Sequence, residues 1–191
     1  MSYFAWASAI LALALYVPLC LQIVKGTVKQ NFTTWLLWAT LDGIAAGTLI
    51  VQQGSYALPT AYTIGSLVTT LCIVRSKNFK WTWFESFVTV LVIACVIIWF
   101  SSGPKMATIV SSVALAVAGI PQLVESARNP WATPILIYFG YFVANVLALA
   151  GAKNWEIPER FYPSCAALFC IGIVILAATR RRYVARSNLT T

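Results

Sequence analysis

The sequence of 191 residues has no histidine, and only 9% of its residues are charged. Without histidine, a Ser-His-Asp or Cys-His catalytic arrangement is impossible, and the commonest protein ligand for metals is missing. A soluble domain carries roughly 25% charged residues, so the scarcity of charge is typical of a chain whose solvent is the bilayer. We therefore expect an integral membrane protein that is not an enzyme and holds no metal and no cofactor.

Apolar residues make up 60% of the chain, and they gather in runs long enough to cross a membrane as helices. Seven runs qualify, at residues 3–24, 34–52, 58–74, 83–100, 106–123, 134–152 and 161–179. The first has no basic residue before it and is too long for a signal-peptide core, so we expect a transmembrane helix there. The breaks between runs carry turn residues and are short, which predicts antiparallel neighbours.

The basic residues are distributed unequally between the two sides of this topology. One side receives Lys25, Lys29, Arg75, Lys77, Lys80, Arg128, Arg180, Arg181, Arg182 and Arg186, and the other receives Lys105, Lys153 and Arg160. The richer side is expected in the cytoplasm, with the C-terminus, while the N-terminus lies outside. The net charge of +8 then indicates topology and contact with membrane lipid, not nucleic acid. A plasma or inner membrane fits this pattern better than an organelle membrane.

The chain repeats itself with an offset of about 103 residues. The matched pairs are Pro18 with Pro121, Trp35 with Tyr138, Trp38 with Tyr141, Asp42 with Asn145, and Pro59 with Pro163. Two three-helix units, residues 1–80 and 105–182, are thus joined by a linker helix within 81–104 and followed by a tail at 183–191. Because each unit has an odd number of spans, the extra helix lets both units face the same way, as parallel repeats. The fold class expected is all-α, with seven transmembrane helices arranged 3+1+3.

The second unit contains the sequence GIPQL at residues 119–123, followed by a short polar loop and an aromatic-rich helix. This resembles the PQ-loop motif, and the 3+1+3 layout is similar to the SWEET transporters and to lysosomal PQ-loop carriers such as cystinosin. The first unit reads YVPLC at residues 16–20 and lacks the glutamine. The resemblance implies transport by alternating access, with Pro18, Pro121 and Gln122 as hinge or gating residues. A static kink at the prolines is the alternative.

Asp42 is the one acidic residue in the middle of a predicted span. A carboxylate there costs about 2.5–3.5 kcal/mol on insertion scales, which favours a functional group facing the bundle interior. We expect Asp42 to bind the solute or a coupling proton. A hydrogen-bonded structural carboxylate that fixes helix packing is the alternative.

Two aromatic stripes accompany this carboxylate on the second and sixth helices. At spacings of three and four residues, each stripe occupies one helix face. The residues expected to bind substrate are Trp35, Trp38 and Asp42 on one stripe and Tyr138, Tyr141 and Asn145 on the other. Facing each other, they would form a cavity at the membrane midplane, where repeat-built transporters bind their substrates. For the four aromatics the alternative is interfacial anchoring or packing.

The resulting hypothesis is a transporter of a small polar solute, coupled to protons through Asp42 as an amino-acid symporter. The alternatives are an uncoupled sugar facilitator of the SWEET type and a ligand-binding receptor with the layout of the KDEL receptor. SWEET proteins place an asparagine on the third helix of each unit, and neither third helix here, residues 58–74 and 161–179, contains one. The partners expected are the solute, protons and lipid. A monomer suffices for a pore, and a homo-oligomer is the other possibility.

Overall fold

The computed structural model describes residues 2–28, 30–76, 83–152 and 155–187. Within these ranges the chain is helical, with no β-strand. The helices are α1 (Tyr3–Val24), α2 (Phe32–Val51), α3 (Ala57–Arg75), α4 (Trp83–Ser102), α5 (Pro104–Ala118), α6 (Ile120–Arg128), the short 3-10 helix η1 (Pro130–Ala132), α7 (Ile135–Gly151) and α8 (Ile157–Ser187). Since α5 and α6 follow each other around Gly119, the α-helices form seven segments, one for each predicted span.

Five of the described segments are long and apolar enough to cross a membrane: α1, α2, α3, the α5–α6 pair and most of α8. The α7 helix is apolar but has only 17 residues, which spans about 26 Å at 1.5 Å per residue. The expected all-helical architecture is confirmed, and the segments are compatible with an integral membrane protein.

Local sequence sets where the first two helices begin. The Ser2 side chain accepts a hydrogen bond from the backbone N–H of Ala5 and so caps α1, and Asn31 caps α2 by accepting from the N–H of Thr34 at 2.9 Å. Each cap satisfies one of the backbone donors that a helix N-terminus leaves free. Ser2 also donates to the carbonyl of Gly151 at 2.8 Å, which ties the start of α1 to the end of α7.

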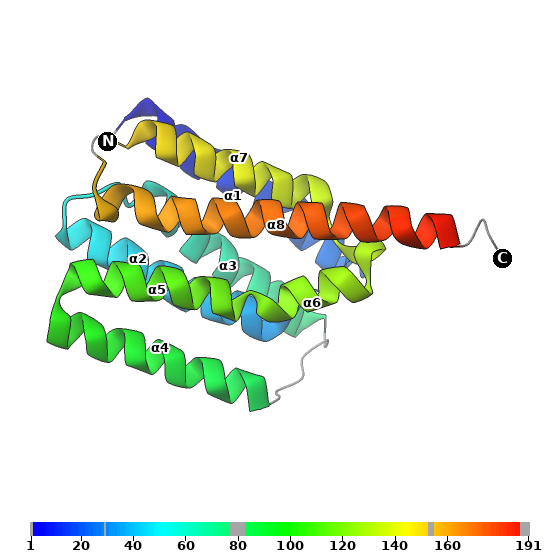
Figure 1. Cartoon of the computed structure of the whole chain (residues 1–191), viewed down its shortest axis with the longest axis horizontal. Coiled ribbons are helices and arrows are strands. Elements are labelled where there is room, and N and C mark those ends of the chain that lie inside the picture. The colour runs from blue at the N-terminus through cyan, green and yellow to red at the C-terminus, as the bar shows by residue number, and fades with distance from the viewer. Residues whose placement is uncertain (1, 29, 77–82, 153–154, 188–191) are drawn as a thin grey trace.

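The helices lie side by side in one bundle, and consecutive segments run in opposite directions (Figure 1). The α3 helix packs against both α1 and α2, while α8 packs against both α5 and α7. These two sets meet through the pairs α1–α7 and α2–α5. The α4 helix lies at the edge of the bundle, against α5 and, less extensively, α2 (Figure 1).

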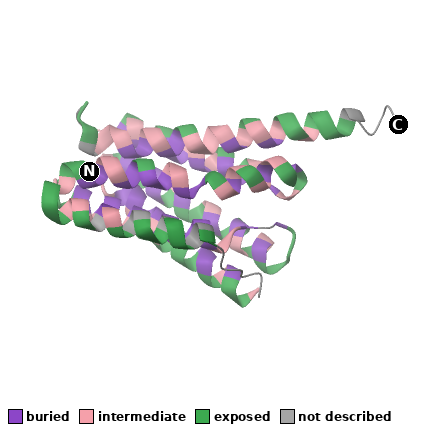
Figure 2. Cartoon of the chain, turned by 60° about the horizontal axis from the view of Figure 1, so that its bottom comes forward, coloured by how far each residue is buried: buried purple, intermediate pink, exposed green. Residues whose placement is uncertain are grey.

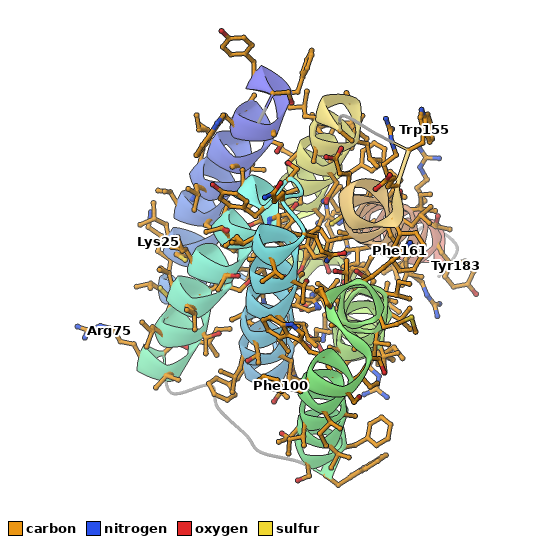
Figure 3. The ribbon with its side chains drawn as sticks, turned by 90° about the vertical axis from the view of Figure 1, so that its left-hand side faces the viewer. Lys25, Arg75, Phe100, Trp155, Phe161 and Tyr183 are labelled. Carbon is orange, nitrogen blue, oxygen red and sulfur yellow. The ribbon has the colours of Figure 1, made fainter. Side chains whose placement is uncertain are left out.

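Because segments alternate in direction, Lys105 and Arg160 lie at one end of the bundle, while most of the described basic residues lie at the other. The helices that end at this end are α1, α3, α6 and α8, and α8 continues beyond the rest of the bundle (Figure 1). We call it the basic end: it carries Lys25, Arg75, Arg128 and the arginines at 180–182. In Figure 3 the side chains of Lys25 and Arg75 reach away from the helices. Of the basic residues assigned to sides above, Lys29, Lys77, Lys80 and Lys153 lie outside the described residues.

The interior is built largely from small residues, and the outside is apolar. Ala12, Ala45, Ala118 and Ala144 are completely buried, and such residues allow close helix contact in membranes. Gly47 serves the same purpose, because the Trp99 ring of α4 lies where its side chain would be. Figure 2 shows buried residues inside the bundle and exposed ones along its outer faces. Those outer faces include large apolar side chains such as Leu71, Leu136 and Leu168, which suits contact with lipid.

Candidate functional site

A small cavity lies between α1, α2, α3, α5, α7 and α8, with a volume of about 40 Å³. Eight of its lining residues are aromatic: Tyr16, Trp35, Trp38, Tyr62, Tyr138, Tyr141, Tyr162 and Phe169. Asp42, Ser66 and Cys170 are its other polar residues, and Leu115 and Ala166 complete the wall. Five of the six residues predicted to bind substrate therefore meet at one cavity.

Asp42 lies in this cavity and is only 3% exposed. The Tyr162 hydroxyl of α8 donates a hydrogen bond to Asp42 Oδ1 at 2.6 Å. Among the described residues, no lysine or arginine lines the cavity. A charged carboxylate here would have one hydrogen bond and no counter-charge, an arrangement that low-dielectric surroundings penalise strongly.

Asn145, the sixth predicted residue, lies behind the cavity wall. It is completely buried, and its Nδ2 donates to the Tyr62 hydroxyl at 2.7 Å and to the Tyr141 carbonyl at 2.8 Å. The Tyr62 hydroxyl in turn donates to the same carbonyl at 3.3 Å. Asn145 thus orients a tyrosine of the cavity wall and does not itself form part of that wall.

The two polar residues of the stripes are held in a crossed arrangement. Asp42 on α2 is bonded to a tyrosine of α8, and Asn145 on α7 is bonded to a tyrosine of α3. Each bond joins the α1–α2–α3 set to the α5–α7–α8 set. The hydrogen bonds at the centre of the bundle therefore connect its two halves.

Most of the ring pairs in the aromatic walls are nearly perpendicular, whereas Tyr16 and Tyr141 meet at 5.2 Å and 49°. Trp35 and Trp38 have ring centroids 5.0 Å apart and planes at 80°, and Tyr62 and Tyr141 are 5.7 Å apart at 82°. Tyr16 meets Trp35 at 5.9 Å and 76°. Edge-to-face contacts of this kind are favourable between aromatic side chains. Neighbouring rings therefore stand as adjacent walls of a box.

Gln30 is bonded to two aromatic residues of the cavity wall. Its Oε1 accepts hydrogen bonds from Trp35 Nε1 at 3.0 Å and from the Tyr138 hydroxyl at 3.1 Å. Both aromatics are only 1% exposed, and Trp35 lies about 10 Å along α2 from Asp42, in the direction of the basic end. One amide oxygen thus joins the matched aromatics of the two repeats. Their burial places Trp35 and Tyr138 inside the bundle, not at an interface with lipid.

A pair of ring–glycine contacts at the cavity wall follows the offset of the predicted repeat. The Tyr16 ring of α1 occupies the space beside Gly65 of α3, and the Phe169 ring of α8 occupies the space beside Gly119. With the offsets of 103 and 104 residues, Tyr16 matches Gly119 and Gly65 matches Phe169. The same contact occurs in both sets, with the ring and the glycine exchanged between the two helices.

The expected hinge residues lie away from the cavity. The α1 helix continues through Pro18, which faces outward, whereas the matched segment divides into α5 and α6 at Gly119, beside Pro121. Gln122 is completely buried, and neither its Nε2 nor its Oε1 has a hydrogen-bond partner. The two matched prolines therefore have different effects on their helices.

Sequence reasoning missed several residues of this site. Tyr162 stands at the start of an apolar run beside Pro163, and Gln30 precedes its helix, so neither falls on a stripe. Tyr16 and Phe169 lie within apolar runs that gave no periodic signal. The offset of the repeat pairs Tyr16 with Gly119 and Phe169 with Gly65. This pairing of a large ring with a glycine was the signal in the sequence that could have identified the two aromatics.

Comparison with protein-family models, with curated proteins and with solved structures gives no match to this chain. The resemblance to PQ-loop carriers therefore stays a prediction from residues 119–123 and from the repeat. What the chain does has to be argued from the geometry of the central cavity.

Proposed function

We propose that this chain is a membrane transporter that moves a small polar solute by alternating access. The observation that carries the proposal is the central cavity, which lies between two sets of three helices and contains the buried carboxyl of Asp42. Repeat-built transporters bind substrate at such a place, between the repeats and near the membrane midplane. Ionisable residues at that depth are functional groups by default.

The helix contacts support two units related by an approximate two-fold axis and joined by α4. The repeat matches α1 with α5, α2 with α7 and α3 with α8. A two-fold axis that interchanges the matched helices turns the contact α1–α7 into the contact α2–α5, and both contacts occur. The weaker contacts α2–α8 and α3–α7 exchange in the same way. The α4 helix lies at the edge of the bundle, which fits a linker whose role is to give both units the same orientation across the membrane.

The small size of the cavity supports a compact state that has no room for the solute. At about 40 Å³ it has room for roughly one or two water molecules, since one molecule of liquid water takes about 30 Å³. A sugar or an amino acid needs more space, so binding requires the two units to move apart. The bonds of Gln30 and the crossed tyrosine bonds connect the units, and we infer that they break as the cavity opens. We also infer that the basic end faces the cytoplasm.

Asp42 is the group that would couple this motion to protons. Burial without a counter-charge favours a cavity that is neutral overall, and a bound proton removes the carboxylate charge. An empty transporter must change its facing from one side of the membrane to the other. An unpaired carboxylate makes this change unfavourable, so Asp42 would be protonated when no solute is bound. Asp42 is therefore the proposed proton-coupling residue, and the charge of the solute decides the direction in which protons move.

Reconstitution in proteoliposomes tests the proposal. Uptake of labelled amino acids, sugars and amines is measured with and without an imposed pH gradient, and we expect saturable uptake of one class that responds to the gradient. The Asp42→Asn variant keeps the size of the side chain and should lose that response. Glu125→Gln, which removes a carboxylate near the end of α6, is the matched control and should retain it. Gradient-independent flux would instead indicate a facilitator, and binding without flux a receptor.

A further inference from the structure

The geometry points to a small organic ammonium ion as the solute, bound by the Asp42 carboxylate and the aromatic walls in exchange for a proton. This inference rests on the proposed function, because it concerns the cavity that the transporter would open. It narrows a small polar solute to one chemical class, and it replaces symport with exchange.

The charge of the cavity supports a cation. Asp42 is the one acidic residue of the wall, and no basic residue lines it among those described. The other titratable groups that face it are five tyrosines and Cys170, contributed by α1, α3, α7 and α8, and these side chains are ordinarily uncharged near pH 7. The cavity with an ionised Asp42 therefore carries one uncompensated negative charge. An ammonium ion compensates it, whereas a sugar does not.

An amino acid fits this cavity less well than an amine does. Its ammonium group would pair with Asp42, but its carboxylate would be buried without a cationic partner. Binding sites for carboxylates normally supply arginine or a row of backbone N–H groups. Among the described lining residues no side chain has that charge. The same asymmetry disfavours zwitterions such as glycine betaine.

The aromatic walls provide the second, independent argument. A cation within about 6 Å of the face of a tryptophan or tyrosine ring is attracted by the ring quadrupole, and aromatic boxes recognise quaternary ammonium groups in this way. Eight aromatic residues surround this cavity, and three of their neighbouring pairs are nearly perpendicular. The Tyr141 hydroxyl is buried and has no hydrogen-bond partner among the described residues, so it is free to bond to a hydroxyl of the solute.

Exchange with a proton follows from the single carboxylate. Only one positive charge compensates Asp42 at a time, whether a proton or the ammonium ion. When the ammonium ion binds, the proton leaves the carboxyl for water on that side, and the cavity stays neutral overall. Solute and proton then cross in opposite directions, one for one. In symport, by contrast, both occupy the site together.

Binding is tested by thermal shift of the full chain in detergent. The probes are methylammonium, ethanolammonium and choline, with 3,3-dimethylbutan-1-ol as the neutral isostere of choline and glycine betaine as its zwitterionic relative. A ligand of the folded state raises the unfolding temperature. We expect at least one ammonium ion to raise it by several degrees and both comparison compounds to leave it unchanged. An equal response to the neutral isostere, or no response to any ammonium ion, would overturn the inference.

Two further measurements assign the effect to Asp42. The Asp42→Asn variant should bind the ammonium probe at least tenfold more weakly, and Glu125→Gln should bind it normally. If Asp42→Asn does not fold, competition with protons in the unaltered chain takes its place. The apparent affinity should then fall by up to tenfold for each pH unit once Asp42 becomes protonated. Affinity independent of pH from 5 to 8 would contradict exchange at Asp42.

Proteoliposomes separate this inference from the proposed function. Choline loaded inside should drive proton uptake from outside, measured with a pH-sensitive dye. If amino acids or sugars cross and ammonium ions neither bind nor cross, the protein is a transporter but its solute is not an ammonium ion. If an ammonium ion binds through Asp42 but nothing crosses, the ligand class is correct and the transporter function is refuted.

Discussion

Replacing Tyr162 with phenylalanine removes one oxygen atom and one hydrogen bond from the centre of the bundle. The lost bond is the 2.6 Å donation to Asp42 Oδ1, and both residues are nearly fully buried. Such bonds contribute about 1.5–3 kcal/mol when the acceptor is charged, while hydrogen bonds measured between membrane helices reach about 1.7 kcal/mol at most. We therefore expect Tyr162→Phe to lower the free energy of unfolding by about 1–2 kcal/mol. At roughly 2–4 °C per kcal/mol, the unfolding temperature falls by about 2–8 °C.

The assay is thermal unfolding of the purified chain in detergent, with Tyr183→Phe as the control. Tyr183 lies near the C-terminal end of the same helix and is 68% exposed, so the same chemical change there should leave the unfolding temperature unaltered. Combining Tyr162→Phe with Asp42→Asn gives a double-mutant cycle, in which the two effects should not add. A loss at position 162 no larger than at position 183, or strict additivity, would refute a bond between the two halves.

Three other substitutions test the remaining contacts. Gln30→Leu leaves an indole N–H and a tyrosine hydroxyl without their shared acceptor, so thermal unfolding should show a loss of about 1–3 kcal/mol. Gly119→Ala places a methyl group against the Phe169 ring and should destabilise the fold by about 1–3 kcal/mol, as measured by denaturant titration. Pro121→Ala restores a backbone N–H where α5 and α6 divide, so we expect slower transport with unchanged solute affinity in proteoliposomes.

Each of these substitutions has its own comparison. Gln22→Leu, which removes an amide at a half-buried position near the end of α1, should cost far less stability. Gly172→Ala should not destabilise the chain, because nothing lies within 4 Å of the added carbon atom. For the proline, Pro18→Ala provides the contrast, since α1 is continuous there. Equal transport rates in the Pro121→Ala variant and the unaltered chain would count against a hinge.

The sequence alone predicted the helices and much of the candidate site. Apolar runs locate all seven helical segments, because a membrane span needs continuous apolar surface, although α8 continues eight residues beyond the run predicted to end at 179. Asp42 stood out since an acidic residue is expensive in such a run. The repeat then pointed to the facing stripe, and Trp35, Trp38, Tyr138 and Tyr141 do line the same cavity as Asp42.

Tertiary structure decided which polar groups meet. Asn145 pairs with a tyrosine behind the wall, while Tyr162 reaches Asp42 across 120 residues of sequence. Contacts between helices this far apart depend on crossing positions and rotation, which hydropathy does not encode. The same holds for Gln30, whose bonds to two aromatics depend on how a turn folds back over the bundle.

The sequence by itself determined that this chain is helical and rich in apolar surface, because these properties follow from composition and from the length of its apolar runs. It also determined that one carboxylate lies deep within an apolar helix. Only the tertiary structure decided that this carboxylate faces aromatic walls with no basic side chain among the described residues that line the cavity. The physical reason is that the net charge of a cavity is the sum over side chains from several helices, so it depends on how those helices pack together.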